Sequence, residues 1–214
     1  MSLHHLTPFR VLVAPGLHNS GPQHWQSRWQ RLYPRFERVE QQRWDEPVLL
    51  RWADRLDQVL DQDHRPTLIV AHSFGCLTTA LSLSRASSPH VAGVLLVGPA
   101  DPDKFQVASL LPQGELPCPS IMVASTNDPW MTAERAAGWA QRWGSDFVNA
   151  GALGHINAES GLGDWRFGQR LLQVLAQRAH NKLFITKENQ NDPTPWRYRP
   201  GLRTGLHHRP HQVP

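Results

Sequence analysis

Ala71-His72-Ser73-Phe74-Gly75 decides the fold of this chain, because it lies between an apolar strand-like run and a helix-like run. The run before it is Thr67-Leu68-Ile69-Val70, and the run after it is Cys76-Leu77-Thr78-Thr79-Ala80-Leu81. A serine at a sharp strand-to-helix turn, with small residues two positions away on both sides, is typical of a nucleophile elbow. Ala71 stands where glycine is usual, and its small side chain still fits such a turn. The alternative is a buried strand that ends in Ser-Phe-Gly by chance, so the rest of the chain must supply partners for Ser73.

The size and composition of the chain suit one domain with a full hydrophobic core, since 40% of the 214 residues are hydrophobic. No apolar run reaches the roughly 18 residues of a membrane span, and the N-terminus lacks the basic-then-apolar layout of a signal peptide. We therefore expect a cytoplasmic protein that is not membrane-bound. Cys76 and Cys118 form no spacing motif, so they are predicted to be reduced core residues, and no metal site is expected.

The surplus of positive charge lies in the C-terminal tail. The net charge is +4, from 22 basic and 18 acidic residues. Residues 181–214 hold six Lys or Arg and two acidic residues, which leaves 16 of each sign in residues 1–180. A neutral body does not predict nucleic-acid binding. The tail is rich in proline and poor in aliphatic residues, so we predict a domain over 1–185 and a disordered basic tail over 186–214. Contact of this tail with RNA or an anionic surface is the alternative to a solvated extension.

Strand-like and helix-like segments alternate along most of the chain. The strand-like segments are mostly unbroken apolar runs, which is typical of a parallel sheet covered by helices on both faces. The predicted fold class is therefore α/β. Strands are predicted at 10–14, 36–41, 67–72, 91–97, 120–124 and 146–149, and helices at 22–33, 47–62, 74–86, 133–143 and 165–177.

Ligand sites in such a sheet form beyond the carboxyl ends of the strands. Ser73 follows one predicted strand, and Asp101 and Asp128 follow two later ones. The connection over residues 98–119 is the longest in the domain, and a long loop often covers a site. A short helix is expected within it, around residues 104–111.

A serine hydroxyl needs a basic partner, and the usual order along an α/β-hydrolase chain is serine, acid, then histidine. His155 and His180 both come late enough in the chain. His180 ends the last predicted helix, where a histidine interacts with the helix dipole. His155 lies in a glycine-containing loop after the last predicted strand, and such a loop can turn back over the sheet. His155 is therefore predicted to be the general base.

Two carboxylates compete to orient His155. Asp128 follows one predicted strand and Asp101 follows the strand before it, and both strand ends adjoin the expected position of the histidine. Asp128 is preferred because it comes one strand before His155 and because Pro129 would fix its loop. Asp101 is then expected to line the substrate pocket or to hold its loop.

The oxyanion of the reaction needs two backbone N–H donors. Position along the chain assigns one to Phe74 and the other to the loop after the first strand, where Leu17 is preferred over His18. The candidates for the substrate pocket are His18, Asp101 and Trp130, followed by His24 and Trp165. His72 precedes the nucleophile and is expected to pack and to make local hydrogen bonds.

A family resemblance rests on the segments Val13-Ala14-Pro15-Gly16, His24-Trp25, Ala71-His72-Ser73-Phe74-Gly75, Asn127-Asp128-Pro129, Gly154-His155-Ile156-Asn157 and Ser160-Gly161. Together they resemble the small serine hydrolases of the α/β-hydrolase superfamily that include retinoblastoma-binding protein nine. The resemblance covers residues 8–178 and omits the tail. It implies a mostly parallel sheet of about six or seven strands with a minimal lid, and a triad of Ser73, Asp128 and His155. A retinoblastoma-binding role is not implied, because the chain has no Leu-x-Cys-x-Glu segment.

The predicted function is a serine hydrolase that cleaves small ester or amide substrates through an acyl-enzyme intermediate. The resemblance implies that it needs no metal or organic cofactor, and its predicted partner is a small acyl compound. A non-catalytic binding or scaffold protein on the same fold is one alternative. An acyltransferase that uses the same triad is the other. The oligomeric state is left open.

Overall fold

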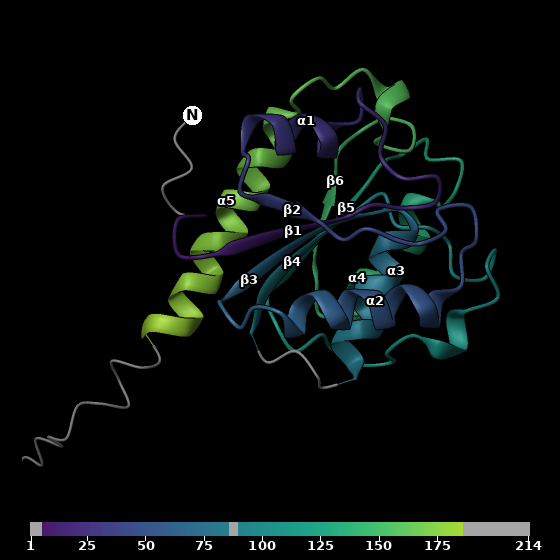
Figure 1. Ribbon diagram of the computed structural model, residues 1–214. Helices are drawn as coiled ribbons and strands as arrows, with labels where there is room; N and C mark the ends of the chain where they lie inside the picture. The colour runs from purple at the N-terminus through teal and green to yellow at the C-terminus, as the bar shows by residue number, and fades with distance from the viewer. Residues whose placement is uncertain (1–5, 86–89, 186–214) are drawn as a thin grey trace, which may run out of the picture.

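The computed structural model describes residues 6–85 and 90–185, and in them it shows a six-stranded parallel sheet (Figure 1). The order across the sheet is β2-β1-β3-β4-β5-β6, and every neighbouring pair is parallel. The predicted α/β fold class is confirmed. The strands are β1 (Arg10–Ala14), β2 (Phe36–Arg38), β3 (Thr67–His72), β4 (Val91–Val97), β5 (Ser120–Ala124) and β6 (Asp146–Asn149).

Helices cover both faces of the sheet, as Figure 1 shows. In the described residues these are α1 (Trp25–Leu32), α2 (Leu49–Asp61), α3 (Phe74–Ser84), α4 (Ala133–Arg142) and α5 (Arg166–His180). The core is correspondingly divided in two: α2, α3 and α4 bury one set of apolar side chains, and α1 and α5 bury the other. Helices therefore cover both faces of the sheet, and the loops lie at the two ends of its strands.

The unbroken apolar runs explain why the central strands lie where they do. All six residues of β3 and all seven of β4 are buried. Successive side chains of a strand point to opposite faces, so Ile69 packs in the core under α2 and α3 while Leu68 and Val70 pack in the core under α1 and α5. Both faces of a central strand must be apolar in this arrangement.

Several predicted elements end at different residues in the structure. The first helix starts at Trp25 and not at residue 22, because the His24 side chain caps it by accepting the N–H of Gln26. The edge strand β2 ends at Arg38 and not at residue 41, because its one partner, β1, ends at Ala14. The last helix runs past residue 177 to His180 and continues as a π-helical turn, Asn181–Ile185. The helix expected around 104–111 is a single 3₁₀ turn, Ala108–Leu110.

Parts of two predictions lie outside the described residues: the end of a helix at residue 86, and the tail 186–214. The domain boundary at residue 185 therefore stays a prediction.

Cys76 and Cys118 are free and buried, as predicted. The described helices include none with the length and apolar composition to cross a membrane. The same part of the chain shows no cluster of three or more metal-binding side chains.

Candidate active site

Ser73 lies at the junction of β3 and α3 with a backbone conformation that residues other than glycine rarely adopt, φ 53° and ψ −123°. Such strain persists only where the surrounding structure enforces it. Here the Ser73 N–H donates to the Val97 carbonyl of β4 at 3.1 Å, which ties the turn to the sheet. Residues 71–75 thus have the backbone geometry that a nucleophile elbow requires, with Ser73 at the end of the strand.

Two glycines provide the room that the elbow needs. A Cβ atom on Gly16 would lie 2.7 Å from the Cβ of Ser73, and one on Gly75 would lie 2.6 Å from the Pro15 carbonyl oxygen. Neither separation is sterically allowed. The loop after β1 and the first turn of α3 can therefore approach each other only because both positions lack a side chain. Ala71, which stands in the usual glycine position, is fully buried and causes no break in β3.

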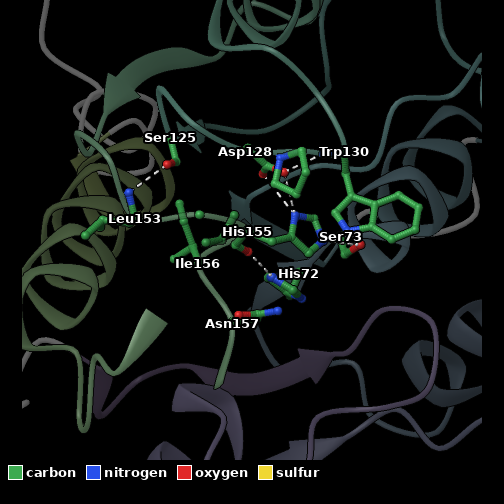
Figure 2. A network of polar contacts seen from close by, with 12 residues as sticks. His72, Ser73, Ser125, Asp128, Trp130, Leu153, His155, Ile156 and Asn157 are labelled. Carbon is green, nitrogen blue, oxygen red and sulfur yellow. Dashed lines mark hydrogen bonds and ion pairs between the residues drawn. The ribbon is translucent and has the colours of Figure 1, made fainter. Parts of the chain in front are cut away.

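His155 lies between Ser73 and Asp128, as Figure 2 shows. Its Nε2 atom is 2.9 Å from Ser73 Oγ, and its Nδ1 atom is 2.9 Å and 3.0 Å from the two carboxylate oxygens of Asp128. A carboxylate accepts, so it favours the tautomer that carries the proton on Nδ1 and leaves the lone pair of Nε2 to the serine hydroxyl. The Asp128 side chain is 2% exposed and that of His155 is 10% exposed. The arrangement can deprotonate a serine.

Hydrogen bonds join the loop that carries the acid to the loop that carries the base. Ser125 Oγ accepts the N–H of Leu153 at 2.8 Å, and Asn127 Oδ1 accepts the N–H of Gly154 at 2.7 Å. Ser125 Oγ also donates to Asn127 Oδ1 at 2.9 Å. These neutral bonds fix the separation of the two loops. Asn127 stood out in the sequence only as a part of the family motif, and Ser125 carried no signal of its own.

The His155 backbone is held by a second histidine. His72 donates from Nε2 to the His155 carbonyl oxygen at 2.9 Å (Figure 2). Burial lowers the pKa of His72 well below its usual value, with smaller contributions from His24 and His155. His72 is therefore neutral, and its ring adds no positive charge beside His155. The prediction that His72 packs is confirmed, but its described side-chain hydrogen bond reaches His155, 83 positions later in the chain, and is not local.

Asp101 does not contact the triad. Its carboxylate pairs with Arg135 of α4 at 2.9 Å and accepts the N–H of Asp103 at 3.1 Å. It is absent from the residues that line the cavity beside Ser73. Of the two expectations for Asp101, that it lines the pocket is wrong, because the ion pair with Arg135 holds its side chain toward α4. The other, that it holds its own loop, agrees with the hydrogen bond from Asp103.

A cavity of about 290 Å³ opens beside Ser73. The pocket candidates His18, Trp130 and His24 line it, and so does Leu17, which was predicted as a backbone donor. Trp165 does not, because it is 4% exposed and packs with the aromatic side chains of α1, with ring centroids 4.9 Å from Trp25 and 6.0 Å from Trp29. The expectation that Trp165 forms a pocket wall is corrected accordingly. The helical spacing of the two α1 tryptophans was the signal for this aromatic cluster.

Other residues on the cavity wall were missed in the sequence. Phe105 comes from the long connection over 98–119, in which Asp101 was the pocket candidate instead. Asn157 and Glu159 follow the base in the chain, and Asn19 belongs to the loop after β1. The proximity of Asn157 to His155 in sequence could have indicated it. Glu159 lies between two segments of the family motif and belongs to neither.

The predicted oxyanion donors, Leu17 and Phe74, can be compared with the amides that lack an acceptor. In the described residues neither the Leu17 nor the Phe74 N–H has an acceptor, whereas the His18 N–H donates to the Trp44 carbonyl at 2.8 Å. A Cβ on Gly16 would lie 3.2 Å from the Phe74 nitrogen, so the loop after β1 runs beside that amide. The bond to Trp44 removes His18 as the alternative donor. Two unpaired amides next to a serine nucleophile suit an oxyanion hole.

Comparison with protein families gives one match over most of the chain: a family model described as serine hydrolase matches residues 11–174. Among solved structures, a YdeN-like hydrolase from Pectobacterium atrosepticum has 35% sequence identity and a TM-score of 0.79. That match covers 82% of this chain and 94% of the other. No curated protein matches the chain.

More distant structures share the fold. The ydeN gene product from B. subtilis has 20% identity and a TM-score of 0.66, over 78% of this chain and 98% of the other. RedJ, a thioesterase from the prodiginine biosynthetic pathway in Streptomyces coelicolor, has 17% identity and a TM-score of 0.53, over 80% of this chain and 90% of the other. At these identities the likeness concerns the fold alone.

Proposed function

The chain belongs to the serine hydrolase family, and we propose that Ser73, His155 and Asp128 are its catalytic triad in the hydrolysis of small esters or amides. The observation that carries the proposal is the continuous set of hydrogen bonds from Ser73 Oγ through His155 to Asp128. Ser73 and His155 line a cavity, and the unpaired backbone amides of Leu17 and Phe74 lie beside Ser73.

The mechanism has two halves. Ser73 Oγ attacks the acyl carbon while His155 Nε2 takes the hydroxyl proton, and the carbonyl electron pair moves to the oxygen, which the Leu17 and Phe74 amides stabilise. The oxyanion then collapses, the bond to the leaving group breaks, and His155 returns its proton to that group. Water repeats the sequence on the acyl-enzyme: His155 takes its proton, the acid product leaves, and Ser73 regains its hydrogen. Asp128 keeps its charge and stabilises the imidazolium in both halves.

The cavity suits a small acyl group, because about 290 Å³ is at the lower end of the volumes typical of ligand pockets. Among the described residues that line it, Glu159 is the one carboxylate, and no lysine or arginine contributes. A neutral or cationic substrate suits such a wall better than an anionic one. We further propose a small-molecule substrate, a cytoplasmic location, and a reaction that uses no metal or organic cofactor.

A fluorophosphonate probe tests the proposal, since it reacts with activated serines. We expect labelling of the wild-type protein at Ser73, loss of labelling in Ser73→Ala, and normal labelling in Ser84→Ala at the far end of α3. Labelling that persists in Ser73→Ala would overturn the assignment. A wild-type protein that resists the probe and every ester tested would favour the scaffold alternative. Transfer of the acyl group to an added alcohol or amine in preference to water would favour an acyltransferase.

A further inference from the structure

Arg38, the last residue of β2, carries a charge that no described acid neutralises in an ion pair. Its side chain is half-buried. The arginine of the neighbouring strand, Arg10, has Glu37 as a partner at 2.7 Å. Removing a charge from water without a counterion is unfavourable, and burial accordingly lowers the pKa of the Arg38 guanidinium, with Glu40 opposing the shift at longer range. The position of this cation therefore needs an explanation.

The guanidinium of Arg38 joins the loop after β1 to helix α1. Its Nη1 donates to Asn19 Oδ1 at 2.6 Å and to the Ser20 carbonyl at 3.1 Å. On the helix, its Nη2 donates to Ser27 Oγ at 2.7 Å and its Nε donates to Gln30 Oε1 at 2.8 Å. All four acceptors are neutral, so these bonds fix geometry and leave the positive charge uncompensated.

The loop that Arg38 holds has a strained backbone. His18 and Asn19 both lie in the left-handed region, with φ 63° and φ 64°. Asn19 Oδ1, which accepts from Arg38, also accepts the Ser20 N–H at 2.7 Å. Consecutive left-handed residues other than glycine are unfavourable and persist only with outside support. The guanidinium provides that support at the residue where the strain lies.

The same loop carries Leu17, which lines the cavity beside Ser73 and whose backbone N–H has no described acceptor. The charge of Arg38 also reaches this cavity. His24 lines its wall, and the pKa of His24 is lowered to about 3 by burial first and then by the charges of Arg38 and His155. At this part of the wall the charge of Arg38 favours the negative charge that develops on an acyl oxygen in the transition state.

We propose that Arg38 is a positioning residue of the oxyanion hole. It holds the loop after β1 so that the Leu17 amide points at the reacting oxygen, and its uncompensated charge favours the oxyanion over the neutral carbonyl. This inference rests on the proposed function, because it assumes that an oxyanion forms at Ser73. It predicts an effect on the transition state and little effect on substrate binding.

The test compares Arg38→Gln and Arg38→Lys in the hydrolysis of a short-chain p-nitrophenyl ester, with a trifluoromethyl ketone as the transition-state analogue. We expect Arg38→Gln to lower kcat by about 10- to 100-fold with KM changed by less than about threefold. The affinity for the ketone should fall by the same factor as kcat/KM. Arg38→Lys keeps the charge and loses the forked hydrogen bonds, so its kcat should lie between those of the wild type and Arg38→Gln.

Arg28→Gln is the matched control, because it removes the same charge from α1, where the described side-chain bonds of Arg28 go to Asp164, at 2.7 Å. Equal losses of kcat in Arg28→Gln and Arg38→Gln would overturn the inference, as would a rise in KM with kcat intact. Thermal unfolding identifies a variant that fails to fold. If Arg38→Gln does not fold, the folded Arg38→Lys variant provides the test. Unchanged kcat and ketone affinity in Arg38→Lys would contradict the proposed role of Arg38. A wild-type protein inert to esters and to the fluorophosphonate would instead overturn the proposed function, and with it this inference.

Discussion

Asp128 and Asp101 follow successive strands of the sheet, yet their side chains have different partners. The Asp128 carboxylate lies 2.9 Å from His155 Nδ1, and its Oδ1 also accepts the Trp130 N–H at 2.8 Å. The Asp101 carboxylate has a salt bridge to Arg135. The hydrogen bond from the Trp130 N–H holds the Asp128 side chain beside His155. The ion pair with Arg135 of α4 holds the Asp101 side chain away from His155. The roles of the two acids can therefore be separated by mutation.

We expect Asp128→Asn to lower kcat/KM for an activated ester by about 10³- to 10⁴-fold, because the amide no longer selects the productive tautomer of His155. Asp101→Asn should change kcat/KM by a few-fold at most, because the substitution weakens a partly exposed ion pair outside the cavity. Steady-state kinetics on both variants measures the difference. A larger loss in Asp101→Asn than in Asp128→Asn would reverse the assignment of the acid.

The candidate triad could be predicted because each member adjoins a recognisable signal. Ser73 follows an apolar run and precedes a helix, and His155 lies in a glycine-containing loop after the last strand. The choice between the two acids was harder, because both follow strands whose ends adjoin the base. Arg38 could not be predicted, because its role depends on contacts with a loop and a helix that its own short edge strand does not indicate.

At the level of elements, close approach and capping set where helices begin. Helix α1 begins where His24 can accept a backbone N–H, and α3 begins where Gly75 lets its first turn press on the end of β1. Hydrophobic periodicity predicted that these helices exist, but it carries no information on the side chains that cap them or the backbone that they contact. The first residue of α1 was misplaced for that reason.

Two glycine-to-alanine changes in helices should have opposite effects on stability. In Gly75→Ala the new methyl would meet the Pro15 carbonyl at 2.6 Å, so we expect a loss of at least about 2 kcal/mol of unfolding free energy and weaker fluorophosphonate labelling. Gly138→Ala in α4 meets nothing within 4 Å, so it should add about 0.5–1 kcal/mol through helix propensity. Chemical denaturation of both variants measures the difference, and a neutral Gly75→Ala would contradict the proposed close packing.

Across the whole molecule, the alternation of strands and helices was predictable, while the order of the strands was not. Unbroken apolar runs indicate burial on both faces. The order β2-β1-β3-β4-β5-β6 depends on pairings between strands far apart in the chain, such as β1 with β3, and no local pattern specifies them. This order brings the loops after β1, β3, β5 and β6 to one edge of the sheet, where the site forms.

The buried histidines make the stability of the folded molecule depend on pH. Burial is the main cause that lowers the pKa of His24 to about 3 and that of His72 well below 6.5, the usual value at which both titrate in the unfolded chain. Below about pH 6.5 the unfolded state binds protons that the folded state does not, so the free energy of unfolding falls as the pH falls. Each group contributes a slope of up to about 1.4 kcal/mol per pH unit, and the effect disappears above pH 7.

Urea unfolding at pH 7.5, 6.0 and 5.0 measures this dependence. We expect the wild type to lose stability steadily below pH 6.5. His24→Asn should show about half that slope, because it removes one of the two titrating groups while asparagine can still cap α1. A wild-type unfolding free energy that is constant between pH 7.5 and 5.0 would contradict the neutral state of both rings.

The distribution of left-handed residues has a consequence for engineering heat tolerance. Within residues 6–85 and 90–185, positive φ occurs at six residues other than glycine, and His18, Asn19, Ser73 and Ile156 among them belong to the loops of the site. Automated sequence optimisation favours residues that relax such backbone, and would place its changes where the chemistry is proposed to occur. A thermostable variant is better sought in the exposed faces of α2 and α4, leaving these loops as they are.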